Sequence, residues 1–288
     1  MEHKQFNIIS LIVLCLIIIS AICFNYIASI NDLETLSQKH NEYLKILLKV
    51  LPMAFVIGLN LIYFFIYRIT VYSIFNMGCL FFCFIGDILV GLYDPNIAEV
   101  ETNKNIYIIF GGAIFFLARI LWTVIFMIKP YKNISCIHYM PYKILISHAA
   151  WITFFILLAL PLLLQNTKLV TVLAFVYIGI SFGFPISYAF LRLINRKRIN
   201  ILPNESFGIA NESFIAVTLS FLGILLFNIS DLLLLYTIQT NLFPNYVILI
   251  SDNIYWLSMY LLTISIVRSP DKTIEKGSYS VLTDEYSS

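Results

Sequence analysis

Charged residues are scarce in this chain of 288 residues, because Asp, Glu, Lys and Arg together make up only 12% of it. An average soluble protein carries roughly 25% of these residues. A disordered chain, a nucleic-acid-binding protein and an ordinary cytosolic enzyme are all poor fits to so low a charge content. Nucleic acid is therefore not an expected partner.

Cysteine and histidine are also few. Of the five cysteines, Cys136 lies in a connecting segment and the others lie within long apolar stretches, so a secreted domain held by disulfides is not indicated. Of the four histidines, only His148 lies within an apolar stretch, whereas a zinc site needs at least three protein ligands. We accordingly expect no metal and no other cofactor, and we expect His148 to be a packing or interfacial residue.

Hydrophobic residues, in contrast, make up 60% of the chain, and the mean hydropathy is +0.89. An apolar stretch of about 20 residues can cross the ~30 Å hydrocarbon core of a bilayer as a helix. Eight such stretches are present, at residues 6–28, 45–67, 71–92, 106–128, 144–164, 169–191, 209–236 and 246–267. The sequence thus predicts an all-α integral membrane bundle of eight transmembrane helices, forming a single domain over residues 1–270. The polar residues 271–288 are expected to be a disordered cytoplasmic tail.

The distribution of basic residues predicts the orientation of the chain. With the N-terminus in the cytoplasm, twelve of the 18 Lys and Arg residues fall in inner segments and four in outer segments. The remaining two, Lys49 and Arg119, lie within spans. This bias agrees with the positive-inside rule, so we expect both termini on the cytoplasmic side.

A small group of ionisable residues lies within the predicted spans, namely Lys49, Asp87, Arg119, Glu212, Asp231 and Asp252. Each would cost ~3 kcal/mol at the centre of a bilayer, so we expect them to face the bundle interior or a wet cavity. Their depth places Glu212 at the inner surface. We expect the other acids and Lys49 to share one outward-opening cavity with Arg119 at its floor. The alternative interpretation is that these residues form salt bridges, such as Lys49–Asp87, that only hold the bundle together.

Two bases against three acids would give a closed cavity a net negative charge. Burial and like-charge repulsion would then keep at least one of the acids protonated near neutral pH. A protonated carboxyl group beside an ionised one can catalyse hydrolysis through an oxocarbenium-like state.

Four of these residues, Lys49, Asp87, Arg119 and Asp231, belong to four segments that carry a resemblance to a known family. These segments are, in order, Lys49-Val-Leu-Pro52, Ile85-Gly86-Asp87, Gly112 to Arg119 and Leu222 to Asp231. Tyr255 in the last span is near an expected aromatic position. With these segments the chain resembles the YhhN family of polytopic membrane proteins, the lysoplasmalogenases, over roughly residues 40–268.

The resemblance implies hydrolysis of the vinyl ether bond of lysoplasmalogens, which releases a fatty aldehyde and glycerophosphoethanolamine or glycerophosphocholine. It places the family's two acidic positions on Asp87 and Asp231, as catalytic residues, and makes Lys49 a partner of a phosphate or a carboxylate. Arg119 and Asp252 are expected to bind substrate or to act as charge partners. The implied partners are a lysophospholipid substrate and membrane lipid, and the implied location is the endoplasmic reticulum or another endomembrane if the chain is eukaryotic.

Arg119 departs from the family pattern, in which this motif usually ends in His. Arginine stays protonated at physiological pH and cannot shuttle protons. One alternative is therefore a divergent or inactive member of the family. Another is a proton-coupled transporter or lipid-handling protein, in which the buried acids bind protons or an amine cargo. The sequence leaves open which Asp is the acid, and it leaves the oligomeric state open.

Overall fold

The computed structural model describes residues 2–31, 38–66, 71–92, 101–128, 141–165, 177–199, 214–240 and 246–267. The elements in these ranges are all helical: α1 (Glu2–Asn31), α2 (Gln38–Ile66), α3 (Val71–Gly91), α4 (Glu101–Ile128), α5 (Pro141–Gln165), η3 (Ile178–Gly183), α7 (Phe184–Ile199), α8 (Phe214–Thr240) and α9 (Tyr246–Val267). η3 is a short π-helix that continues directly into α7.

Among the described residues, six helices are long and apolar enough to cross a membrane. Their spanning windows are Phe6–Ile27, Leu44–Phe65, Tyr72–Gly91, Tyr142–Leu160, Phe214–Tyr236 and Val247–Ile266. Two shorter apolar segments lie in α4 and in the η3–α7 rod. Large apolar side chains such as Ile8 and Leu11 on α1 and Leu145 on α5 are exposed on the bundle surface, a surface that suits hydrocarbon. The α-helical membrane bundle expected from the sequence is thereby confirmed.

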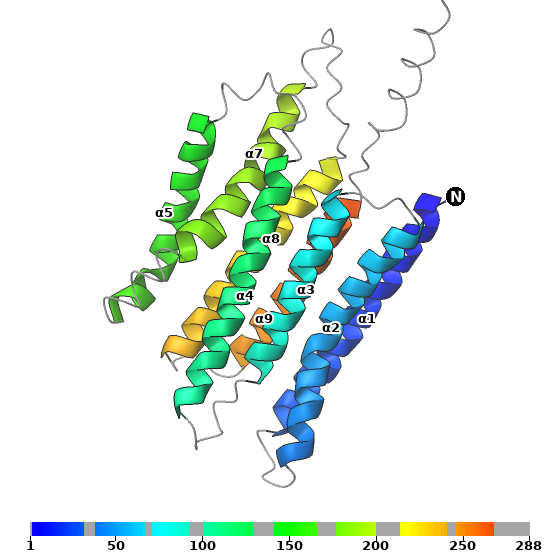
Figure 1. The fold of residues 1–288 in the computed structure, drawn as a ribbon, viewed down its shortest axis with the longest axis vertical. Coiled ribbons are helices and arrows are strands. Elements are labelled where there is room, and N and C mark those ends of the chain that lie inside the picture. Colours follow the sequence, from blue (N-terminus) through cyan, green and yellow to red (C-terminus); the bar gives the residue numbers. More distant parts are fainter. Residues whose placement is uncertain are drawn as a thin grey trace, which may run out of the picture.

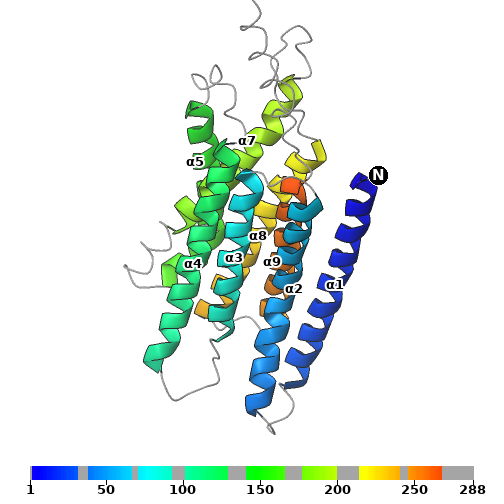
Figure 2. The ribbon, with the colours of Figure 1, turned by 45° about the vertical axis from the view of Figure 1, so that its right-hand side comes forward.

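Successive helices run in alternating directions, so the first residues of α1 and the last residues of α9 lie at the same end of the bundle (Figure 1). α1 and α2 form one side of the bundle, α5 and α7 the other, and α3, α4, α8 and α9 lie between them (Figure 2). The most extensive packing joins α8 to α9 and α3 to α4. These four central helices supply most of the candidate site.

Glycine allows close approach at both of these helix pairs. An added Cβ at Gly86 on α3 would lie 2.9 Å from the ring of Phe115 on α4. At Gly223 on α8 it would lie 2.7 Å from Cγ of Leu262 on α9. Small residues let membrane helices pack closely, because van der Waals contact between helices replaces the hydrophobic effect in lipid.

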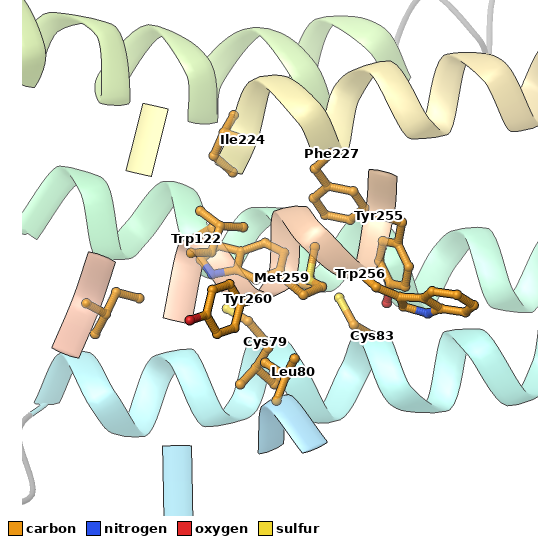
Figure 3. Packing of buried hydrophobic residues seen from close by; sticks show 14 of the residues in the cluster. Cys79, Leu80, Cys83, Trp122, Ile224, Phe227, Tyr255, Trp256, Met259 and Tyr260 are labelled. Atoms are coloured by element: carbon orange, nitrogen blue, oxygen red, sulfur yellow. The ribbon is translucent and has the colours of Figure 1, made fainter. Parts of the chain in front are cut away.

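The core between the central helices is apolar and aromatic (Figure 3). Trp122 on α4 and Phe227 on α8 are fully buried, and their rings pack edge to face with centroids 5.5 Å apart. Cys79 and Cys83 on α3 are buried beside this core. Such tight packing fixes the helix rotations and therefore the direction in which each polar side chain points.

The helix boundaries differ from the predicted spans in one informative place. The sixth span was expected at residues 169–191, followed by a break at the basic cluster from Arg192 to Arg198. Instead the η3–α7 rod continues to Ile199, so this cluster lies on a helix. Arg192 is buried, and its guanidinium lies 5.4 Å from the ring centroid of Phe126, within the range of a cation–π contact. Glu212 and residues 271–288 lie outside the described residues.

Candidate functional site

Asp87 lies in the second half of α3, on the face that packs against α4 and α9. Its carboxyl group is buried, with 3% of the residue exposed. The hydroxyl of Tyr255 on α9 donates a hydrogen bond to Oδ2 of Asp87 at 3.0 Å. Cys83 precedes Asp87 by one turn, so the two side chains share one helix face. Helical spacing and burial thus turn Asp87 toward Tyr255, away from lipid.

Arg119 on α4 is fully buried and binds three different groups. Its Nη2 donates to Oδ2 of Asp231 on α8 at 2.6 Å. Its Nη1 donates to the backbone oxygen of Ser181 at 3.1 Å and to the side-chain oxygen of Asn228. A buried guanidinium is tolerable only when its charge is paired and most of its N–H groups find partners. These contacts engage both terminal nitrogens of Arg119, while Nε finds no hydrogen-bond partner among the described residues.

Two aromatic rings flank the guanidinium of Arg119. Its central carbon lies 3.8 Å from the ring centroid of Phe227 and 4.7 Å from that of Phe182. Cation–π contacts of this kind gain strength when the charge is desolvated. The rings therefore confine Arg119 from two directions while its hydrogen bonds confine it in the others.

Tyr177 makes a second contact to Asp231. Its hydroxyl donates to the same oxygen, Oδ2, at 3.0 Å. Tyr177 is the residue directly before η3. The side-chain nitrogen of Asn228 in turn donates to the backbone oxygen of Phe182 at 3.4 Å. The π-helical turn and α8 thus face each other through a continuous polar network around Asp231.

Lys49 on α2 forms an ion pair with Asp252 on α9, with Nζ and Oδ2 3.2 Å apart. The two side chains are 13% and 9% exposed, so the pair is nearly but not fully covered. The suggested Lys49–Asp87 bridge is therefore not the pairing found, since Asp252 on the neighbouring helix lies closer to Lys49. Asp87 remains within electrostatic range of Lys49, Asp252 and Asp231.

Two serines join α8 to α9. Ser230 directly precedes Asp231 on α8, and Ser251 directly precedes Asp252 on α9. Ser230 donates to the backbone oxygen of Ser251 at 2.9 Å, and Ser251 donates to the backbone oxygen of Ser230 at 2.8 Å. We call this reciprocal pair the serine clasp. Because each serine directly precedes an Asp, the clasp fixes where along the α8–α9 interface the side chains of Asp231 and Asp252 point away from it.

An aromatic layer lies between the Asp87 and Asp231 regions. The ring of Phe115 packs edge to face against Tyr255 and Phe227, with centroids 5.9 and 6.4 Å apart. Phe227 and Tyr255 are themselves 5.6 Å apart (Figure 3). Tyr255 touches Asp87 with its hydroxyl, and Phe227 touches Arg119 with its face. The two polar regions are therefore neighbours separated by aromatic rings.

Five of the six ionisable residues singled out in the sequence lie in this central region, and the sixth, Glu212, lies outside the described residues. Arg119 and Asp231 are in direct contact, as are Lys49 and Asp252, while Asp87 contacts Tyr255. Sequence reasoning overlooked Tyr177 and Ser181, although both are polar residues within a predicted apolar span and could have been noted for that reason. His148 stacks on Phe184 with ring centroids 3.8 Å apart, which is a packing contact.

The described residues hold no group of three His, Cys, Asp or Glu side chains arranged to bind a metal ion. The chemistry available in this region is that of carboxyl groups, hydroxyls and two cations. Comparison of the chain with models of protein families, with curated proteins and with solved structures finds no match.

Proposed function

We propose that this protein is a membrane-embedded lipid hydrolase that cleaves the vinyl ether bond of lysoplasmalogens, as its resemblance to the YhhN family implies. The observation that carries the proposal is the placement of two carboxyl groups, Asp87 and Asp231, in one region of the bundle with different neighbours. Carboxyl pairs in unlike environments divide the roles of acid and base between them.

The neighbours suggest which carboxyl takes which role. Asp231 forms an ion pair with the guanidinium of Arg119, with Oδ2 and the guanidinium nitrogen 2.6 Å apart. Asp87 is buried and accepts a hydrogen bond from the neutral hydroxyl of Tyr255. We therefore assign Asp87 as the proton donor and Asp231 as the carboxylate that stabilises the cation or activates water.

The proposed reaction needs one water molecule and no other reactant. Asp87 delivers its proton to the β-carbon of the enol ether, and the double-bond electrons leave an oxocarbenium ion at the ether carbon. Water adds to that carbon and gives one proton to a carboxylate. The product of this addition is a hemiacetal. The hemiacetal then breaks its carbon–oxygen bond, releasing a fatty aldehyde and the glycerophospho-base alcohol.

The Lys49–Asp252 pair is suited to the polar end of such a substrate. Both of its side chains are partly exposed, at 13% and 9%, and its two charges match the phosphate and the amine of a zwitterionic headgroup. The apolar chain of the lipid would lie in or beside the bundle in hydrocarbon. We further propose an endomembrane location such as the endoplasmic reticulum, with both termini in the cytoplasm.

The direct test is aldehyde release by the purified full chain in nanodiscs supplied with a lysoplasmalogen. Wild-type protein should release aldehyde, and Asp87→Asn or Asp231→Asn should lower kcat by about 100-fold or more. Asp252→Asn should instead act mainly by raising KM. The Tyr260→Phe variant is a suitable control, because its hydroxyl donates to the backbone of Ser10 at 3.0 Å, on another helix.

Two results would contradict this proposal. Aldehyde release that survives both Asp substitutions would overturn the site. Wild-type protein without aldehyde release, but with proton-coupled uptake of an amine into liposomes, would favour the transporter alternative.

A further inference from the structure

Both hydrogen bonds received by Asp231 end on the same carboxylate oxygen. Arg119 on α4 and Tyr177, directly before η3, donate to Oδ2 at 2.6 and 3.0 Å. The Asp231 side chain is 15% exposed, whereas the Arg119 side chain is 0% exposed. One oxygen of the carboxylate is thus held by protein, and the group as a whole still reaches accessible space.

Arg119 is not placed to bind a substrate phosphate, because its side chain is 0% exposed. Its two terminal nitrogens bind Asp231, Asn228 and the backbone of Ser181. Rings cover it on two sides, so a phosphate would have to displace both protein ligands and aromatic contacts. The guanidinium fork presents its N–H donors in fixed directions, so it can hold the carboxylate of Asp231 in one orientation.

The π-helical turn η3 lies beside Arg119 and Asp231 and contributes several of the contacts around them. η3 and the residue before it supply three contacts: the Tyr177 hydroxyl to Asp231, the Ser181 carbonyl to Arg119, and the Phe182 carbonyl to Asn228. A carbonyl has two lone pairs and can accept a second hydrogen bond from outside its own helix. π-Helical turns are rare, and those that do occur often lie at functional sites.

We propose that Arg119 and Tyr177 form a clamp on Asp231, which fixes Oδ2 and leaves Oδ1 as the oxygen that meets the reacting carbon or the water. Asn228 supports the clamp by accepting a hydrogen bond from Arg119. Arg119 and Tyr177 are then positioning residues that act through Asp231. This inference rests on the proposed hydrolase function. It also gives Arg119 a role that requires no proton transfer, in contrast to a histidine at the same position.

The test compares Tyr177→Phe and Arg119→Lys with the control Tyr260→Phe in the full chain in nanodiscs. Tyr177→Phe removes the hydrogen bond from the tyrosine hydroxyl to Oδ2 of Asp231. Arg119→Lys keeps the positive charge but loses the planar array of N–H donors that a guanidinium provides. We expect each to lower kcat per folded molecule about 10-fold or more, with KM within about twofold of wild type. Tyr260→Phe also loses a buried hydroxyl bond and should keep the wild-type kcat.

A stability measurement tests the clamp independently of activity. Because Tyr177 and Asp231 are in contact, Tyr177→Phe and Asp231→Asn should lower the melting temperature by less in combination than the sum of their single effects. Additive shifts in melting temperature would overturn the clamp.

Activity separates this inference from the function on which it rests. Wild-type kcat in Tyr177→Phe, or a change confined to KM, would overturn the positioning role while leaving the hydrolase intact. Absence of aldehyde release by wild-type protein would overturn the hydrolase and the role of Oδ1 together, and the melting-temperature comparison would still decide whether the clamp exists.

Discussion

Ser230 on α8 and Ser251 on α9 donate to each other's backbone oxygens, at 2.9 and 2.8 Å, and their hydroxyl oxygens lie 3.2 Å apart. Each serine is followed by an aspartate whose side chain contacts a helix other than α8 and α9. Asp231 meets Arg119 on α4, and Asp252 meets Lys49 on α2. The clasp therefore stands between the two ion pairs of the candidate site.

Removal of either clasp serine should lower the stability of the bundle. Ser230→Ala or Ser251→Ala should each cost about 0.5–1.5 kcal/mol, because interhelical hydrogen bonds in membranes have this magnitude. The double variant should cost less than the sum, since each serine binds the other. Unfolding by SDS titration would measure these differences, with Ser220→Ala as control because its hydroxyl bonds within its own helix. Equal losses at Ser220 and in the clasp would contradict an interhelical role.

Gly223→Ala should separate α8 from α9. The added Cβ would lie 2.7 Å from Cγ of Leu262 and 3.2 Å from its backbone nitrogen, so the helices must move apart. Overpacking of this kind costs about 1–3 kcal/mol. The matched control is Gly58→Ala on α2, where no atom lies within 4 Å of the added Cβ. That change should be neutral or stabilising by about 0.5–1 kcal/mol, since alanine is the better helix former. Thermal unfolding of both variants measures whether Gly223→Ala lowers the stability of the protein while Gly58→Ala does not.

Lys49→Met should destabilise the protein by leaving Asp252 without its cation. The two side chains are 13% and 9% exposed, so the carboxylate gains little help from solvent. Loss of one partner from a buried ion pair costs about 3 kcal/mol, and much of that cost is the charge left behind. Adding Asp252→Asn should therefore restore part of the lost stability. A double variant less stable than Lys49→Met would show that Asp252 does not depend on Lys49.

The expected orientation can be tested through glycosylation in a eukaryotic host. Asn133-Ile-Ser135 and Asn204-Glu-Ser206 match the acceptor pattern but fall in predicted inner segments. Both should remain unmodified, whereas an acceptor pattern inserted after Asn96, in a predicted outer segment, should be glycosylated. Gel mobility before and after glycosidase treatment is the measurement, and a glycan on Asn133 or Asn204 would reverse the orientation.

The helices were predictable from sequence because apolar run length alone decides whether a segment can cross a bilayer. Asp87, Arg119 and Asp231 were recognisable for a related reason, since a charge inside such a run is costly and must face inward. Their pairing was not predictable. Arg119 and Asp231 are 112 positions apart, and which acid meets which base depends on helix neighbours and rotations that local sequence does not encode.

The π-helical turn was beyond the reach of sequence reasoning as well. Residues 178–183 read Ile-Gly-Ile-Ser-Phe-Gly, and nothing in this composition distinguishes a π-helix from an α-helix. Tyr177 is likewise an ordinary aromatic residue in an apolar span until Asp231 is placed beside its hydroxyl. Contacts made by common residue types emerge only from the packed structure.

The contacts made by α9 bear on how the protein is synthesised. α9 supplies Tyr255 to Asp87, across 168 positions of sequence, and Asp252 to Lys49. α2 and α3 leave the ribosome well before α9, so Lys49 and Asp87 enter the membrane before their partners exist. Lys49 and Asp87 therefore lack these partners until the last helix is inserted. A nascent chain truncated before α9 should consequently be a substrate for membrane quality control.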